Sequence, residues 1–394
     1  MQQPTAMNLR AAIRPALLSL LLVLPSACGD AGPTGLEGPP VVAGRVTNAV
    51  NRRPVVGAVV TVGNAVDTTD VEGRYKLTDV PTGVTKAICK APGYNNDVAD
   101  IVLTTGTLNH NIALARIEVF DFGDFSLYVP AGVDTARGIL LALGGPDTRG
   151  FPAGKPFGAP LPAVEKSLQE LGKQYRTLAD TLGLAILGTN LAAMTNAPES
   201  DALLLNAIHF AGDTSHRAQL TTAPLLLYGM SGGGPEASGF AARNPDRVAG
   251  VFLKVPAGVA SLTGGNALKV PTYVVLAEPD AFVDNAALNA TFAGNRQAGA
   301  LWALAKELGL PHHALSPAQR SVTLAWMGAI LERRLPESPS GPLREIPENA
   351  GWLGDPAAFK FWSWSSYPGD RTVASWLPSE NTASDWVTIS TLTP

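Results

Sequence analysis

One serine in this chain has a setting that favours nucleophilic chemistry. Ser231 follows the apolar run Leu225 to Tyr228, and residues 229 to 233 read Gly-Met-Ser-Gly-Gly. The apolar run predicts a buried strand, and glycine two residues to either side of the serine lets that strand and a following helix approach without Cβ clashes. A serine on such a sharp turn holds its hydroxyl exposed, so Ser231 is the predicted nucleophile.

This chemistry needs two further side chains. A serine hydroxyl is a poor nucleophile at neutral pH, so a histidine must accept its proton and a carboxylate must orient the imidazole. The five histidines of the chain are His110, His209, His216, His312 and His313. The acidic residues after the apolar run 272–277 are Glu278, Asp280 and Asp284.

The elements around the serine turn predict a layered architecture. Helical residues 237–243 and the apolar run 248–253 follow Ser231, so strand, helix and strand succeed one another. Upstream, residues 119–130, 138–143 and 184–187 predict strands, and residues 164–182 and 201–210 predict helices. This alternation predicts a mostly parallel sheet with helices on both faces.

The serine turn, with an acid and a histidine after it, resembles the α/β-hydrolase superfamily over about residues 116–335. The resemblance implies the α/β-hydrolase fold, the chain order serine, acid, histidine, and ester hydrolysis through an acyl-enzyme. It leaves His312 and His313 as the candidate bases. It points to Asp280 as the acid, with Glu278 as the alternative, because residues 277–280 are similar to the G-x-x-D loop of these hydrolases.

Between the two histidines, His313 is the predicted base and His312 the alternative. Ser316 is a good N-cap, Pro317 follows it and Gln319 lies three residues after it, so a helix is predicted to start there. His313 would lie in the short loop just before this helix. The stretch from His313 to Pro317 also resembles the one after the catalytic histidine of many bacterial esterases.

Two backbone N–H groups are predicted to bind the oxyanion of the transition state. The first is that of Gly232, directly after the nucleophile. The family implies a second from the loop after residue 143, where Gly145 is preferred because Pro146 has no N–H. No Gly-Lys-Ser/Thr follows this loop and no His-Glu-x-x-His or Cys/His cluster is present, so neither a metal nor a cofactor is expected.

Residues 41–115 predict a separate, small all-β sandwich. Apolar and polar residues alternate between turns rich in Gly, Asn, Asp and Pro. The stretches 44–58, 69–75 and 80–94 resemble the carboxypeptidase regulatory-like family, which implies a non-catalytic module often fused to secreted enzymes. Residues 116–336 are then the predicted catalytic domain.

The N-terminus predicts export. Residues 1–27 hold Arg10 and Arg14 before the apolar stretch 16–24, as in a signal peptide too short to span a bilayer. Residues 24–28, Leu-Pro-Ser-Ala-Cys, resemble a bacterial lipoprotein cleavage box, which implies a lipid anchor on Cys28; the alternative is ordinary secretion. Residues 28–40, rich in Gly and Pro, are predicted to be a tether.

Composition excludes other classes. The net charge is -4, or -6 without residues 1–27, which carry two Arg and no acid, and no basic patch suggests a nucleic-acid partner. With only two cysteines, an exported form must be stabilised by apolar burial rather than by disulfides. Residues 337–394 carry five of the seven Trp and are predicted to pack on the catalytic domain, with an aromatic wall of the substrate cleft as the alternative.

These observations predict an exported serine esterase. Only residues 258–270 separate the strand after the nucleophile helix from the strand leading to the acid, too few for a cap domain. An open cleft would accept bulky or polymeric esters as well as small ones. The alternatives are a serine peptidase or amidase, which uses the same triad, and a non-catalytic surface binding protein on a hydrolase fold.

Overall fold

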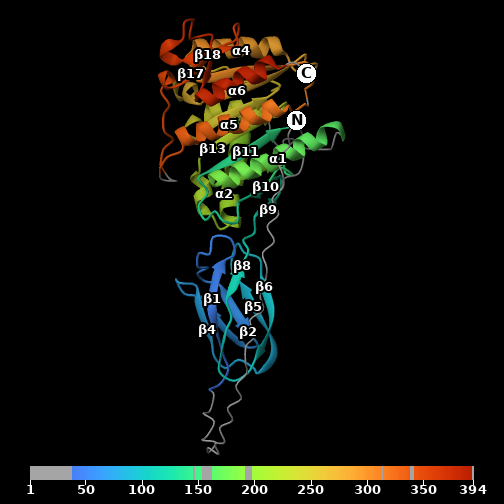
Figure 1. Cartoon of the computed structure of the whole chain (residues 1–394), viewed down its shortest axis with the longest axis vertical. Coiled ribbons are helices and arrows are strands. Elements are labelled where there is room, and N and C mark those ends of the chain that lie inside the picture. The colour runs from blue at the N-terminus through green and yellow to red at the C-terminus, as the bar shows by residue number, and fades with distance from the viewer. Residues whose placement is uncertain are drawn as a thin grey trace, which may run out of the picture.

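The computed structural model describes residues 38–144, 147–152, 162–190, 198–312, 314–337 and 341–392. In these ranges the chain forms a small β-sandwich, a large mixed sheet flanked by helices and a short C-terminal sheet (Figure 1). The predictions for residues 1–37, including Cys28, and for Gly145 and His313 lie outside them. None of the helices in these ranges has the length and apolar character that a membrane span requires.

The β-sandwich consists of two sheets. In one, the order is β4-β1-β7, with β8 also paired to β1, and in the other it is β3-β2-β5-β6. Alternation decides what is buried: in β4, Tyr75 and Leu77 point into the core, while Arg74 and Lys76 face solvent. The strands are β1 (Val41–Asn48), β2 (Val59–Val62), β3 (Ala65–Thr68), β4 (Arg74–Leu77), β5 (Gly83–Lys90), β6 (Asp97–Leu103), β7 (Thr107–Asn109) and β8 (Ile112–Leu114).

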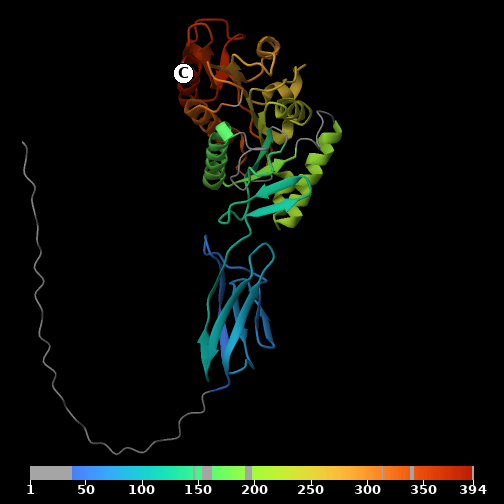
Figure 2. The ribbon, with the colours of Figure 1, turned by 90° about the vertical axis from the view of Figure 1, so that its right-hand side faces the viewer.

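The sandwich projects from the β9–β10 edge of the large sheet (Figure 1 and Figure 2). Polar contacts join the two parts at Asp134, which forms ion pairs of 2.8 Å with both Arg53 and Arg116. Arg116 also donates to the hydroxyl of Tyr94 over 3.0 Å. The junction is therefore a charged contact rather than a shared apolar core.

The large sheet has eight strands in the order β9-β10-β12-β11-β13-β14-β15-β16. Strand β10 is antiparallel to both its neighbours, and the pairs from β12 to β16 are all parallel. The predicted mostly parallel sheet behind a small β-sandwich is thus confirmed. The strands are β9 (Val119–Phe122), β10 (Phe125–Tyr128), β11 (Gly138–Gly144), β12 (Leu184–Thr189), β13 (Leu225–Met230), β14 (Val248–Lys254), β15 (Thr272–Glu278) and β16 (Trp302–Leu308).

Helices cover both faces of this sheet. Helices α1, α5 and α6 contribute buried side chains to one apolar cluster, and α2, α3 and α4 contribute to another on the opposite face. Both faces of the strands are therefore buried, which explains their nearly continuous apolar sequences. The helices are α1 (Pro162–Leu182), α2 (Pro198–Thr214), α3 (Gly233–Arg243), α4 (Asn285–Gln297), α5 (Pro317–Arg334) and α6 (Glu380–Thr391).

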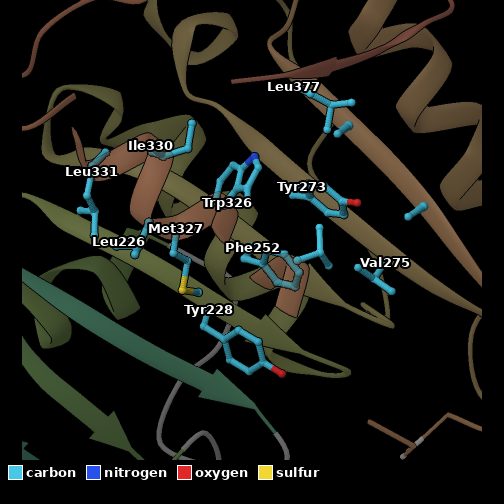
Figure 3. Close-up of a cluster of buried hydrophobic side chains, with 14 of the residues drawn as sticks. Leu226, Tyr228, Phe252, Tyr273, Val275, Trp326, Met327, Ile330, Leu331 and Leu377 are labelled. Atoms are coloured by element: carbon cyan, nitrogen blue, oxygen red, sulfur yellow. The ribbon is translucent and has the colours of Figure 1, made fainter. Parts of the chain in front are cut away.

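The first apolar cluster contains a row of stacked aromatic rings (Figure 3). The ring centroids of Tyr228 and Phe252 are 6.2 Å apart and those of Phe252 and Tyr273 are 5.2 Å apart, one ring from each of β13, β14 and β15. Trp326 of α5 packs edge-on against the last two rings. The four rings form one packed layer across the three strands and the helix.

The C-terminal segment covers the free edge of β16. It forms a three-stranded antiparallel sheet, with β17 (Trp352–Asp355) between β18 (Lys360–Ser363) and β19 (Ser375–Leu377), followed by α6. The Ser375 hydroxyl accepts the N–H of Leu304, and the Trp386 indole donates to the carbonyl of Leu304. The edge strand thus has side-chain partners in place of another strand.

Candidate active site

Ser231 occupies a strained turn between β13 and α3. Its φ angle is 51°, a left-handed conformation that non-glycine residues seldom adopt. The turn is fixed by three backbone hydrogen bonds: Ser231 N–H donates to the carbonyl of Lys254 over 3.1 Å, and Ser231 C=O accepts from Gly234 and Ala257. Hydrogen bonds with strand β14 and the segment after it therefore stabilise the strained conformation of Ser231.

Two glycines around Ser231 are required by close approach. A Cβ at Gly229 would lie 2.7 Å from the carbonyl oxygen of Gly233, and one at Gly233 would lie 2.1 Å from the carbonyl oxygen of Leu143. Neither contact is sterically possible without moving backbone. The predicted reason for these glycines, close packing of strand and helix at the serine, agrees with this geometry.

Ser231, His312 and Asp280 form a hydrogen-bonded line. His312 Nε2 lies 3.0 Å from Ser231 Oγ, and His312 Nδ1 lies 2.7 Å from Asp280 Oδ2. The side chains of His312 and Asp280 are 2% and 0% exposed. With Nδ1 donating to the carboxylate, Nε2 is free of its proton and can accept the serine hydroxyl, which is the tautomer that a general base needs.

The histidine at Ser231 is His312, so the preference for His313 is corrected. The N-cap of α5 is at Ser316, as expected, and its hydroxyl accepts the N–H of Gln319 over 2.9 Å. The cap lies four positions after the histidine rather than three. The cap position was predicted correctly, and the error lies in the register of the loop, which short-range sequence patterns do not determine.

Asp280 is the acid that faces His312, as predicted. Its second oxygen, Oδ1, accepts the N–H of Phe282 over 2.8 Å. Burial alone would raise the pKa of Asp280, but the hydrogen bonds from His312 and Phe282 outweigh burial and lower that pKa. The alternative acid, Glu278, has a side chain 48% exposed and pairs with Lys306 at 3.5 Å, away from the histidine.

Of the two predicted oxyanion donors, the structure describes Gly232 and not Gly145. Gly232 is the N-cap residue of α3, where backbone N–H groups have no partner within the helix. Gly145 lies outside the described residues, but Gly144 before it approaches the serine turn: a Cβ there would lie 3.0 Å from the Met230 Cβ. The placement of Gly145 remains a prediction.

Two features of the site were not predicted from the sequence. The side chain of Phe282 is 72% exposed, and its ring centroid lies 5.0 Å from that of His312. Lys254 and Glu307 form a buried ion pair at the carboxyl ends of β14 and β16. In the sequence, Phe282 is the aromatic residue in the loop after β15, and Lys254 and Glu307 are charged residues at the ends of otherwise mostly apolar strands.

No group of three or more His, Cys, Asp or Glu side chains in the described part of the chain could hold a metal ion. The arrangement at Ser231 brings a serine hydroxyl, an imidazole and a carboxylate together in the order that acyl-transfer chemistry requires.

The strand order and the serine turn define the large-sheet region, residues 119–334, as an α/β-hydrolase fold. A family model of the carboxypeptidase regulatory-like domain matches residues 41–115, so the resemblance predicted for the sandwich is confirmed. Among curated proteins, none matches this chain.

Several solved structures are similar to this chain. A thermostable esterase is 12% identical over 77% of this chain and 99% of its own, with a TM-score of 0.40. A predicted CIB-like hydrolase from Thermoplasma acidophilum is 17% identical over 53% of this chain and 96% of its own, with a TM-score of 0.35. A phospholipase/carboxylesterase from Dyadobacter fermentans is 16% identical over 53% of this chain and 98% of its own, with a TM-score of 0.34.

Proposed function

We propose that this protein is a serine hydrolase that cleaves carboxylic esters through Ser231, His312 and Asp280. The observation that carries the proposal is the continuous line of hydrogen bonds, 3.0 Å from Ser231 to His312 and 2.7 Å from His312 to Asp280. These are the distances at which a base can take the serine proton and a carboxylate can stabilise the imidazolium that forms.

The reaction has two halves. Ser231 Oγ attacks the ester carbonyl while His312 Nε2 takes its proton, and the oxyanion is bound by the N–H groups of Gly232 and Gly145. The carbon–oxygen bond of the ester then breaks, and His312 gives its proton to the departing alcohol, which leaves an acyl group on Ser231. Water, deprotonated by His312, attacks the acyl group and releases the acid, and the proton returns to Ser231.

We propose that substrates reach Ser231 through an open cleft. Between β14 and β15, the segment 255–271 contains one regular element, a 3-10 helix at Gly265–Lys269. A segment of this length supplies no cap domain over the site. Bulky and polymeric esters therefore belong to the proposed substrate range, together with small ones.

The test of this function is covalent labelling. A fluorophosphonate probe should label the wild type, and Ser231→Ala should lose both labelling and hydrolysis of a short p-nitrophenyl ester, by on the order of 10³-fold or more in kcat. Ser261→Ala, at an exposed serine after β14, is the matched control and should retain both. A folded wild type that is not labelled would favour a non-catalytic binding protein, and faster cleavage of amides than of esters would favour a peptidase.

We further propose that the protein is exported and anchored by lipid at Cys28. The support is the sequence of residues 1–28, an apolar stretch after two arginines that ends at a cysteine. Mass spectrometry of the mature N-terminus tests this proposal. A diacylglyceryl group on Cys28 is the expected result, and an unmodified N-terminus beyond Cys28 would contradict the anchor.

A further inference from the structure

A buried pair of opposite charges lies behind the Ser231 site. Lys254, the last residue of β14, is 0% exposed, and its Nζ forms an ion pair with Oε2 of Glu307, which is 2% exposed. The two residues belong to strands that are not neighbours, because β15 lies between them. In the ladders of the intervening strand β15, Val275 is paired with Lys254 and Ala277 is paired with Glu307.

Stability alone is a weak reason for such a pair. Removing two charges from water costs free energy that their attraction often fails to recover, and apolar side chains of similar volume are frequently as stable. The pair also lies on the face of the sheet that is otherwise packed with the apolar and aromatic side chains shown in Figure 3. The contacts of the pair connect it to the Ser231 site.

The first contact leads to the histidine loop. Oε1 of Glu307 accepts the hydroxyl of Ser316, and the Ser316 oxygen in turn accepts the N–H of Gln319 at the start of α5. His312 lies in the loop between β16 and this helix. Glu307 therefore connects the two ends of the loop that carries the histidine.

The second contact leads to the serine. The carbonyl of Lys254 accepts the N–H of Ser231 over 3.1 Å. Burial lowers the pKa of the Lys254 ammonium, and the negative charges of Glu307 and Asp280 oppose that shift.

We propose that Lys254 and Glu307 are positioning residues for the site. Lys254 anchors Glu307, and Glu307 holds the His312 loop through Ser316. The inference rests on the proposed serine hydrolase function. Neither side chain is exposed to substrate, so their loss should reduce kcat and leave KM nearly unchanged.

The test replaces the pair as a unit. Lys254→Met alone would leave Glu307 buried without its counter-ion, so the variant of choice is Lys254→Met with Glu307→Leu, which keeps the volume and removes both charges. We expect a folded protein whose kcat for a p-nitrophenyl ester falls on the order of 10- to 100-fold, with KM within about twofold. Wild-type kcat in this folded double variant would overturn the proposal.

A second ion pair, with one of its two side chains buried, provides the control. Arg296 of α4 is 0% exposed and pairs at 3.3 Å with Glu348, which is 35% exposed, next to the C-terminal sheet rather than Ser231. Arg296→Met with Glu348→Gln should lower the melting temperature and leave kcat unchanged. An equal loss of kcat in both double variants would assign the effect to general loosening and would overturn the proposal.

A milder variant keeps the inference testable if the double variant does not fold. Ser316→Ala cuts the link between Glu307 and α5 at the expense of one helix cap, and kcat should fall while KM stays constant; an unchanged kcat would overturn the role of the loop anchor. The wild type is measured in parallel. A wild type without labelling or hydrolysis contradicts the proposed function itself, whereas an active wild type with an equally active double variant contradicts only the positioning role.

Discussion

The sandwich and the large-sheet region bury different kinds of side chain. Among the described residues 38–115, the buried polar side chains are those of Asn48 and Thr69, and none is charged. The large-sheet region buries several charged side chains, among them Arg217, Arg296 and Arg334, and at the carboxyl end of its sheet it also buries Lys254, Glu307 and His312. Because buried charge is expensive and perturbed titratable groups cluster at functional sites, the three buried side chains near Ser231 favour a functional role for this end of the sheet.

The two regions also differ in where non-glycine residues adopt a positive φ angle. In the sandwich, the non-glycine residues with positive φ are Arg52 and Asp79, both exposed in turns. In the large-sheet region, the exposed His216 has φ of 54°, and two further residues stand one after each of two adjacent strands: Ser231 with φ of 51° and the fully buried Val255 with φ of 40°. Strain in a packed interior needs support from many contacts, so its location again singles out the serine turn.

The largest expected effect tests whether the buried charge of this region is functional. His312→Ala removes the base that contacts Ser231 at 3.0 Å, so kcat should fall on the order of 10³-fold or more. His313→Ala should leave kcat within about threefold, because the described contacts with Ser231 and Asp280 are made by His312. Ester hydrolysis by the two purified variants measures the difference.

The opposite ranking of these histidine variants would contradict the site. Equal, small losses in both would remove the general base from the proposal altogether. Circular dichroism of each variant provides the control, because His312 is 2% exposed and its loss must not be confused with unfolding.

His312 and His313 also show which features of the site can be predicted from the sequence and which cannot. The serine turn, the strand before Asp280 and the helix cap at Ser316 are local features, and each was predictable from residues a few positions apart. Which of two adjacent histidines turns toward Ser231 depends on the path of the loop from Leu308 to Ser316. In the described part of that loop, the Gly309 N–H donates to the carbonyl of Glu278 in β15, a long-range contact that no local pattern predicts.

Long-range packing also explains the other omissions. Lys254 meets Glu307 across an intervening strand, 53 positions apart in the chain, and nothing near either residue indicates the partner. No sequence pattern distinguishes Phe282 from other loop residues, and the turn after β15 places its ring next to His312. The fold follows from periodicity and short motifs, whereas the surroundings of the site follow from register and side-chain reach.

A smaller effect is expected at the exposed edge of the site. In the proposed mechanism His312 protonates the departing alcohol, and the Phe282 ring, 72% exposed, lies 5.0 Å from the imidazole, so we expect a large alcohol group to contact Phe282. Phe282→Ala should lose about 1 kcal/mol of apolar contact with a large alcohol, or about a fivefold rise in KM for benzyl esters. Methyl esters of the same acid should change little, and equal changes for both esters would contradict contact with the alcohol.

The smallest effect on activity is expected in the sandwich, where one hydrogen bond supports the core without any link to Ser231. The Tyr75 hydroxyl donates to the carbonyl of His110 over 2.6 Å, and the residue is 4% exposed. Tyr75→Phe should cost the sandwich about 1 kcal/mol of unfolding free energy and leave kcat unchanged.

All seven Trp lie after residue 301, so tryptophan fluorescence follows only the large-sheet region and the C-terminal segment, whereas far-ultraviolet circular dichroism follows the sandwich as well. The fluorescence midpoint in urea should therefore match the wild type, and only the dichroism curve should move to lower urea concentration. A parallel shift of both curves would show that the two regions unfold together, coupled by the contacts of Asp134 with Arg53 and Arg116. The sandwich and the large-sheet region would then be two parts of one cooperative structure rather than separate folding units.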